Sequence, residues 1–382
     1  MASFEITGGS KLSGKITIAG NKNSVLPIMA ACLLTKEDCV IKNVPQISDV
    51  QVMSQLLKLC GAEIKDLDDN SLKISCGKIH YADFPSELTE KLRASVLLLG
   101  PMLVRIGKIK MGYPGGDVIG RRPLETHIQA LESFGAGVKK QDDFYLAEAK
   151  DLKGTEIFLQ EASVTATENA IMVASLAIGK TTIKRAASEP HVQDLCNFLN
   201  SMGAKITGIG TNVLNIEGVK DLNGTTYSIG PDHIEVGTFA ILAAVCGGEI
   251  ELSPVNVQDL DMIMLTLEKF GVKLKSKGNT LTVHGSTLKA IEKVVTDVWP
   301  GFPTDLIAPM IVLATQADGV TILHDWMYES RMFFVDKLLS MGAKVEIADP
   351  HRVLVYGPSK LHGQRLDTPD IRAGIALVIA AL

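Results

Sequence analysis

Residues 112–123 place one acid and two bases in a segment that cannot be a helix or a central strand. The segment reads Gly-Tyr-Pro-Gly-Gly-Asp-Val-Ile-Gly-Arg-Arg-Pro, so four glycines and two prolines surround Asp117, Arg121 and Arg122. Glycine permits positive φ, while proline fixes φ and removes a donor, which together predict a long loop. Loops on a rigid scaffold often carry function, so Asp117 is a candidate proton donor. The alternative is a glycine-rich surface loop in which this aspartate has no chemical role.

Three cationic residues stand at the expected starts of apolar helices, namely Lys22, Arg93 and Arg372. The free N–H groups and the dipole at a helix N-terminus add to such a charge and favour anion binding. The arginine fork in particular suits carboxylate and phosphate. The alternative is that Lys22 is an ordinary solvated lysine, beside an N-cap at Asn23 or Ser24.

Further polar residues occupy the matching positions before other apolar helices: Ser163, residues 232–235 and Asp305. Helix capping explains any one of them. If all six sets converge on one cleft between two domains, they would form an anion site.

A repeat of about 70 residues organises the chain. The pattern large apolar, Gly, small or apolar, any, apolar recurs five times, with its glycine at Gly61, Gly135, Gly203, Gly271 and Gly342. These glycines are spaced by 74, 68, 68 and 71 residues. Each fits the left-handed position just past a helix end, where a Cβ would be strained.

Each glycine follows an amphipathic helix, and each repeat opens with a second helix that is apolar nearly all round. The amphipathic pattern is clearest in Val192, Leu195, Cys196, Leu199 and Met202. Uniformly apolar helices should be buried, so we expect helices inside and sheets outside. The six expected buried helices are Ser24–Leu34, Ala94–Val104, Ala170–Ile178, Thr238–Cys246, Leu306–Ala314 and Ile371–Leu382.

The repeats predict an α/β protein of two domains. The first domain spans residues 21–229, with three complete repeats and the loop 112–123, and the second joins residues 1–20 to 230–382. The N-terminal residues would supply strands to the later repeats. The sixth repeat is expected to be incomplete, because its glycine would fall beyond Leu382. The sequence is therefore expected to be either a fragment or a protein that has lost half of a repeat.

Composition excludes several classes of protein. The net charge of -5 disfavours a general nucleic-acid binder. The six cysteines form no Cys-x-x-Cys pair and no metal-ligand spacing, which indicates free thiols in a reducing compartment and no metal site. The N-terminus lacks a signal peptide, and the longest apolar stretch, Ala94–Val104, is too short to span a bilayer. A soluble cytoplasmic protein is expected. The sequence does not indicate its oligomeric state.

Four motifs, in residues 20–24, 114–123, 302–305 and 370–372, resemble the UDP-N-acetylglucosamine 1-carboxyvinyltransferase family along the whole chain. The resemblance implies two inside-out α/β barrel domains, each built of three βαβαββ-like repeats. It implies a cytoplasmic transferase, without a cofactor, acting on phosphoenolpyruvate and UDP-N-acetylglucosamine. The reaction adds the sugar 3′-hydroxyl to the enol ether and eliminates phosphate, as the first committed step of peptidoglycan synthesis.

The resemblance also implies the site residues. Lys22, Asn23, Arg122 and Arg372 would bind phosphoenolpyruvate, and Lys22, Asp117 and Asp305 would act in catalysis. Asp305 is the expected general base and Asp117 the expected general acid. A free aspartic acid has a pKa of roughly 3.9, so the acid role needs desolvation as the loop closes. The nucleotide sugar would contact Arg93, Arg122, Pro123, Leu124, Glu125, Thr126, Ser163, Val164, Asp305 and Met327.

The chain departs from the family at four places. Asp117 stands where most members have cysteine, so the thiol-alkylating epoxide fosfomycin should not inactivate the protein. Glu161 replaces a lysine typical of the uridine pocket, and His233 replaces a familiar arginine beside the cleft. In the family, the half of the sixth repeat that is missing here normally supplies another arginine that binds the substrate carboxylate.

Two other functions remain open on the sequence. A 5-enolpyruvylshikimate-3-phosphate synthase would share the fold and the phosphoenolpyruvate chemistry, but it carries an Asn-Ala-Gly-Thr segment that is absent here. A catalytically silent homologue that binds nucleotide sugar is the other possibility, although Lys22, Asp117, Arg122, Asp305 and Arg372 are all present.

Overall fold

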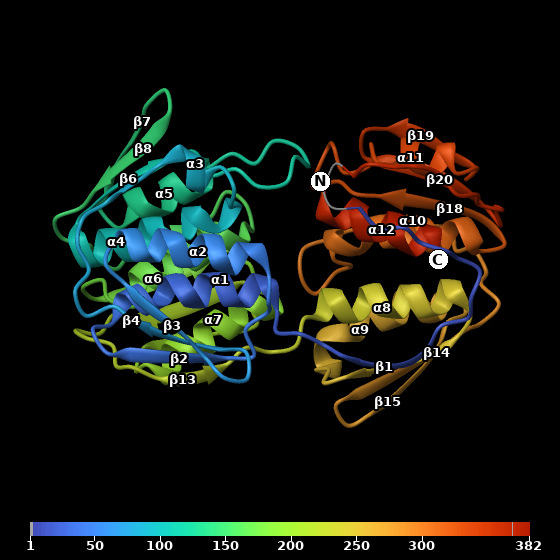
Figure 1. Cartoon of the computed structure of the whole chain (residues 1–382). Helices are drawn as coiled ribbons and strands as arrows, with labels where there is room; N and C mark the ends of the chain where they lie inside the picture. Colours follow the sequence, from blue (N-terminus) through green and yellow to red (C-terminus); the bar gives the residue numbers. More distant parts are fainter. Residues whose placement is uncertain (1–2, 369) are drawn as a thin grey trace. The chain divides into compact units, whose positions relative to one another are not determined.

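The computed structural model describes residues 3–368 and 370–382 (Figure 1). Contacts divide the chain into two compact units. Unit 1 holds the chain up to Ile18, the short segment Asp117–Arg122, and the chain from Pro231 onward. Unit 2 holds Ala19–Gly116 and Pro123–Gly230.

The second repeat shows the βαβαββ pattern in full. A parallel pair, β5 and β6, joins an antiparallel set of β6, β8 and β7, in the sheet order β5-β6-β8-β7. The elements in chain order are β5 (Asp83–Phe84), α3 (Ser86–Thr89), a 3-10 helix (Arg93–Leu98), α4 (Leu99–Ile106), β6 (Lys108–Gly112), α5 (Glu125–Ser133), β7 (Gly137–Lys140) and β8 (Phe144–Glu148).

The other two repeats of unit 2 follow the same pattern. The first consists of α1 (Lys22–Ala31), a 3-10 helix (Cys32–Leu34), β2 (Asp38–Lys42), α2 (Ser48–Leu59), β3 (Glu63–Leu67) and β4 (Ser71–Ser75). The third consists of β9 (Glu156–Phe158), α6 (Val164–Ala174), β10 (Lys180–Lys184), α7 (Pro190–Ser201), β11 (Lys205–Thr207) and β12 (Val213–Glu217). The last strand of the unit, β13 (Thr226–Ser228), runs parallel to β2 and completes the first sheet.

Unit 1 contains the fourth and fifth repeats and the first helix of a sixth. The fourth consists of α8 (His233–Cys246), β14 (Glu249–Ser253), a 3-10 helix (Val257–Leu260), α9 (Asp261–Lys269), β15 (Lys273–Lys277) and β16 (Thr280–His284). The fifth consists of β17 (Lys293–Val295), a 3-10 helix (Thr304–Leu306), α10 (Ile307–Gln316), β18 (Gly319–His324), α11 (Val335–Ser340), β19 (Val345–Asp349) and β20 (Arg352–Gly357). The sixth begins with α12 (Ile371–Ala381). Strand β1 (Ser13–Thr17) pairs in parallel with β14, which confirms that the N-terminal segment supplies a strand to a later repeat.

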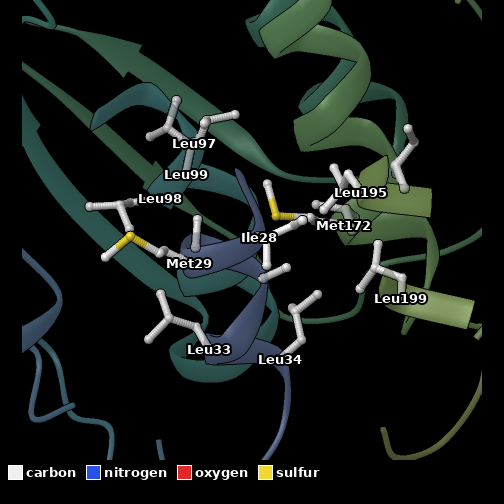
Figure 2. Close-up of a cluster of buried hydrophobic side chains, with 14 of the residues drawn as sticks. Ile28, Met29, Leu33, Leu34, Leu97, Leu98, Leu99, Met172, Leu195 and Leu199 are labelled. Atoms are coloured by element: carbon white, nitrogen blue, oxygen red, sulfur yellow. The ribbon is translucent and has the colours of Figure 1, made fainter. Parts of the chain in front are cut away.

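The first helix of each repeat forms the core, as its composition predicts. All of α1 from Ser24 to Ala31 is buried, and so is α6 from Ala166 onward. Figure 2 shows Ile28 and Met29 of α1 packed among leucine and methionine side chains of neighbouring elements. Strands such as β15 keep an exposed lysine row on their outer face. Among the described residues, the strands form separate four-stranded sheets and do not close into a β-barrel.

The five repeat glycines end their helices as predicted. Their φ angles lie between 89° and 102°, in the left-handed region that favours glycine. After α7, the N–H of Ala204 donates to the carbonyl of Leu199 at 3.0 Å. The residue after each of the other four glycines makes the same bond five positions back, which is the Schellman motif.

Three of the expected helix starts are wrong, and one of them is that of α8, which begins at His233 rather than at Thr238. Helix α6 begins at Val164 rather than at Ala170, because its first turns contain polar residues that are nevertheless buried. Thr167 accepts from the N–H of Ala187, and Asn169 donates to the carbonyls of Val96 and Thr165. An apolar pattern cannot detect such turns. In the second repeat, residues 93–98 form a 3-10 helix before α4 begins.

The cysteines are free thiols and five of the six are buried. In the described part of the chain, no three His, Cys, Asp or Glu residues are arranged to hold a metal ion. Every helix within the described ranges is too short or too polar to cross a membrane.

Candidate active site

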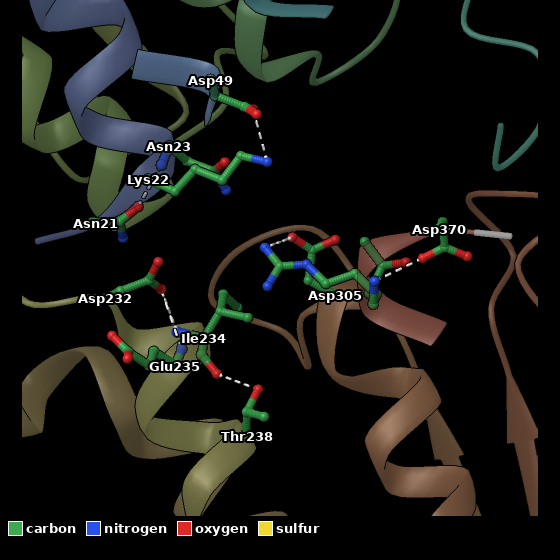
Figure 3. A network of polar contacts seen from close by, with 12 residues as sticks. Asn21, Lys22, Asn23, Asp49, Asp232, Ile234, Glu235, Thr238, Asp305 and Asp370 are labelled. Atoms are coloured by element: carbon green, nitrogen blue, oxygen red, sulfur yellow. Dashed lines mark hydrogen bonds and ion pairs between the residues drawn. The ribbon is translucent and has the colours of Figure 1, made fainter. Parts of the chain in front are cut away.

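Lys22 lies in the first turn of α1, where the sequence predicts it. The Asn21 side chain caps this helix by accepting from the N–H groups of Asn23 at 2.8 Å and Ser24 at 3.3 Å. The Lys22 ammonium pairs with the Asp49 carboxylate at 2.9 Å (Figure 3). Both side chains are about one-quarter exposed, at 27% and 26%. The ammonium therefore has a fixed partner, and it differs from an ordinary solvated lysine in that respect.

The first half of the glycine-rich loop is hydrogen-bonded to the end of α3. The N–H of Gly115 donates to the carbonyl of Thr89 and that of Gly116 to the carbonyl of Glu90, both at 3.0 Å. Arg93 donates to the carbonyl of Pro114 at 3.4 Å. A Cβ on Gly115 would overlap the Glu90 carbonyl, so this close approach requires glycine.

The second half of the loop, Asp117–Arg122, belongs to unit 1 by its contacts. Arg122 donates to the backbone carbonyl of Asp117 at 2.7 Å, which bends the loop around the candidate acid. The Asp117 side chain is half-buried, Ile119 is buried, and Val118 between them is 80% exposed.

Two arginines converge on Asp305 in unit 1. Arg331 contacts one carboxylate oxygen at 2.9 Å, and Arg372 contacts the other at 2.8 Å. Burial on its own would raise the pKa of Asp305, but the charges of Arg372 and Arg331 and their hydrogen bonds outweigh it and hold the pKa well below its usual range. The carboxylate is therefore ionised and accepts a proton poorly while both arginines are in place.

Arg372 lies in the first turn of α12, whose start is fixed by an N-cap. The Asp370 carboxylate accepts from the N–H groups of Arg372 at 2.8 Å and Ala373 at 3.0 Å (Figure 3). The same device positions the start of α8, where Asp232 accepts from Ile234 at 2.9 Å and Glu235 at 3.3 Å. Helix capping thus accounts for Asp370 and Asp232, while the side chain of Arg372 pairs with Asp305.

A fully buried acid, Asp325, supports this arginine cluster. Its carboxylate accepts from the hydroxyls of Thr296 at 2.9 Å and Thr304 at 2.6 Å, and from the N–H of Met327 at 3.0 Å. Arg331 adds a bond to the carbonyl of Thr304 at 2.9 Å. Sequence reasoning missed Asp325 and Arg331. The only signal was a polar segment directly after a strand, which is weak.

Apart from Arg93, the predicted nucleotide-sugar residues of unit 2 lie at the starts of two helices. Residues 123–126 enter α5, and Ser163 and Val164 begin α6, with the Ser163 hydroxyl accepting from the N–H of Ala166 at 3.5 Å. His127 of α5 bonds Thr165 of α6 at 2.8 Å and so joins the two starts. Burial, with a smaller effect of Arg93, lowers the pKa of His127 to about 3. Sequence reasoning did not single out this histidine.

The two pocket departures lie in different settings. Glu161 is exposed, whereas His233 is buried at the start of α8 with its ring 6.0 Å from that of Trp299. Burial lowers the pKa of His233 to about 4, although Asp305 acts to raise it and Arg372 lowers it further. A neutral imidazole therefore stands where the resemblance implies an arginine.

Comparison with known proteins identifies the fold and the family. The family model described as EPSP synthase (3-phosphoshikimate 1-carboxyvinyltransferase) matches residues 6–382. In fold, the chain is similar to the enolpyruvyl transferase NikO from Streptomyces tendae, with a TM-score of 0.88 and 23% identity over 98% of this chain and 89% of that one. It is also similar to an EPSP synthase from Acinetobacter baumannii, with a TM-score of 0.75 and 18% identity over 98% and 90% of the two chains. These likenesses define an enolpyruvyl transferase fold.

Curated relatives define the family more narrowly. UDP-N-acetylglucosamine 1-carboxyvinyltransferase of Treponema denticola is 48% identical over 100% of this chain and 91% of its own length. The Borreliella burgdorferi protein of the same name is 47% identical with the same coverage, and that of Bacteroides fragilis is 44% identical over 100% and 92%. The chain belongs to the UDP-N-acetylglucosamine 1-carboxyvinyltransferase family of transferases.

Proposed function

We propose that this protein transfers the enolpyruvyl group of phosphoenolpyruvate to the 3′-hydroxyl of UDP-N-acetylglucosamine and releases phosphate. The observation that carries the proposal is the 44–48% identity, along the whole chain, to relatives named for this reaction. The reaction commits the sugar to peptidoglycan and thus to cell-wall biogenesis, cell shape and cell division. Both substrates are metabolites of the cytoplasm, where we place the protein.

Phosphoenolpyruvate is assigned to Lys22, Asn23, Arg122 and Arg372. Together the two substrates carry roughly five negative charges, so pooled cations supply both attraction and screening. The cap of α1 and the Asp49 partner support this assignment for Lys22, because they hold its ammonium at a helix N-terminus.

The nucleotide sugar is assigned to residues at the starts of α5 and α6 and to the other residues that match the motifs of the family. The His127 bond to Thr165 supports the first part, because it fixes the two helix starts against each other. Helix N-termini present free N–H groups to a diphosphate. The residues concerned are Arg93, Arg122, Pro123, Leu124, Glu125, Thr126, Ser163, Val164, Asp305 and Met327.

The general base is Asp305, and its strength as a base depends on whether Arg372 is paired with it. While both arginines contact it, the depressed pKa makes this carboxylate a weak base. An anionic substrate that draws Arg372 away removes one positive neighbour and raises the basicity of Asp305. Substrate binding would then prepare the base for its proton.

The chemical steps balance in two stages. In the first stage the oxygen of the sugar 3′-hydroxyl bonds to C2 of phosphoenolpyruvate. Asp305 takes the proton of this hydroxyl, and Asp117 gives a proton to C3. In the second stage the Asp117 carboxylate takes a proton back from C3, the C2=C3 double bond re-forms and the C2–O bond to phosphate breaks. The proton held by Asp305 passes to the leaving phosphate, and the enolpyruvyl ether and phosphate are released. Carboxylic acids on opposite faces of the alkene suffice for both stages.

Phosphate release tests the proposal directly. The protein is incubated with phosphoenolpyruvate and UDP-N-acetylglucosamine, and inorganic phosphate and the enolpyruvyl product are measured. Parallel reactions replace the nucleotide sugar with shikimate 3-phosphate. Release with the nucleotide sugar alone supports the proposal, while release only with shikimate 3-phosphate assigns the chain to the other enolpyruvyl transferase. Binding of the nucleotide sugar without any turnover would identify a catalytically silent homologue.

A further inference from the structure

The second half of the glycine-rich loop is attached to the segment that follows β18. The N–H of Arg121 donates to the Glu329 carboxylate at 2.9 Å, across 208 residues of sequence. Beside this bond, the N–H of Ser330 donates to the carbonyl of Ile119 at 3.2 Å. The two bonds run in opposite directions, so they fix both the position and the orientation of the loop backbone.

The carboxylate lies directly against the loop backbone. Gly120 has a φ of 132°, and a Cβ there would overlap Oε2 of Glu329. Only glycine allows this approach. The bond from the Arg121 N–H is the largest influence that lowers the pKa of Glu329, which agrees with an ionised acceptor at this place.

The residues held by these contacts are close to Asp117 along the chain. Ile119 is buried, with 5% of its surface exposed, and it is only two residues from the candidate acid. Arg122, next to the anchored Arg121, donates to the Asp117 carbonyl. Fixing residues 119–121 therefore fixes the backbone on the C-terminal side of Asp117.

We propose that Glu329 is a positioning residue for the reaction, holding the loop that carries Asp117 through the Arg121 N–H. It touches no reacting atom and acts through the loop backbone. The effect of Glu329 on turnover rests on the proposed function, whereas its effect on the mobility of the loop does not. Loop mobility and turnover are therefore measured in separate experiments.

Trypsin reports on the loop without any need for activity. It can cleave after Arg121, while the bond after Arg122 is resistant because Pro123 follows. Cleavage at this site in the native full chain is followed by the masses of the two fragments. We expect Glu329→Ala to speed this cleavage about tenfold, because a charge-assisted hydrogen bond is lost. Glu329→Gln should lie between the two, since its amide oxygen can still accept.

The matched control is Glu268→Ala, which removes an exposed acid of α9 in the same unit. It should cleave at the wild-type rate. An unchanged cleavage rate in Glu329→Ala would overturn the inference, whatever the activity of the protein. A general rise in cleavage at all tryptic sites would show unfolding instead, and it would also count against a local role.

Turnover provides the second measurement. In a wild-type protein that releases phosphate, Glu329→Ala should lower kcat at least tenfold with a smaller change in KM, because the acid is misplaced while all assigned binding residues outside the loop remain. Glu329→Gln should recover part of kcat. If the wild type has no activity, the proposed function fails and the cleavage result still stands. If the wild type is active and Glu329→Ala keeps its kcat, the positioning role is wrong.

Gly120→Ala tests the same contact from the loop side. Its methyl group would displace the Glu329 carboxylate, so we expect faster cleavage after Arg121. In a Glu329→Ala background the same change should add less, because the overlap is gone and only the backbone strain of positive φ remains. Fully additive effects of the two changes would contradict direct coupling.

Discussion

Arg372 and Asp305, 67 residues apart in sequence, are joined by a hydrogen-bonded ion pair of 2.8 Å. The same carboxylate binds Arg331 through its other oxygen. This arrangement makes the expected base of the reaction a poor proton acceptor at rest, and it ties that base to an arginine expected to bind substrate. The pair thus couples substrate binding to base strength.

Removing one arginine should change the pH dependence of turnover. In Arg331→Gln, Asp305 loses a positive neighbour, so its pKa rises toward the ordinary value of roughly 3.9 or above it. The acid limb of kcat/KM should then move to higher pH, with kcat lowered as well. The measurement is a pH–rate profile of phosphate release from pH 4 to 9, in which we expect an acid limb from Asp305 in the variant and none in the wild type. The same profile for both proteins at the acid end would show that Asp305 is not the titrating base.

The stability consequence of Asp305 has a defined sign. Its folded pKa lies below the unfolded one, so its ionisation stabilises the fold above pH ~3.9, and that contribution is lost as pH falls toward the folded pKa. Changes in stability between pH 5 and 7 must therefore come from other groups.

Asp117 should act as an acid and make the protein resistant to fosfomycin. We expect Asp117→Asn to lower kcat by at least about 100-fold, since the amide cannot supply a proton. Asp117→Cys should keep much of the activity, because a thiol can do so. Phosphate release measured before and after incubation with fosfomycin should show inactivation of the cysteine variant alone. A fully active asparagine variant, or covalent labelling of the wild type at Asp117, would contradict the assignment.

His233 should make unit 1 less stable in mild acid. Its folded pKa of about 4 lies below the unfolded value of roughly 6.5, so the unfolded chain binds more protons between these values. Stability should fall as pH decreases through this window, by about 2 kcal/mol between pH 7.5 and 5. Both tryptophans, Trp299 and Trp326, lie in unit 1, so denaturation followed by tryptophan fluorescence reports on this unit.

The control for this effect is His233→Asn, which should flatten the pH dependence of the tryptophan-detected unfolding free energy. The pKa of His127 in unit 2 is also lowered by burial. Because unit 2 has no tryptophan, His127 should not contribute to the tryptophan signal. An identical slope in His233→Asn and wild type would show that another group is responsible.

The repeat glycines should be costly to replace even where there is room. Gly203 has a φ of 102°, and an added Cβ would meet only the Asn223 amide, at 3.4 Å. Gly203→Ala should therefore destabilise unit 2 by about 1–2 kcal/mol through backbone strain alone. The matched change Gly363→Ala, at a site with open space and no positive φ, should leave thermal stability unchanged or slightly raised. Equal melting temperatures for the two variants would exclude the strain.

The amino-acid sequence was sufficient for the repeat architecture. Helix period, apolar composition and the glycine at each helix end are local properties, so the buried helices and the left-handed positions follow from a few consecutive residues. The same locality explains the errors: the first turns of α6 are polar, and their partners, such as Ala187 and Val96, lie outside any window along the chain.

For the candidate site, the sequence by itself determined which residue types stand at the helix starts and in the loop, through motifs with strict spacing. The tertiary structure alone decided the pairing of Asp305 with Arg331 and Arg372, the buried support from Asp325, and the attachment of the loop to Glu329. Those contacts join residues 21 to 208 positions apart. Their distances, burial and pKa shifts depend on how the repeats pack, which no local pattern specifies.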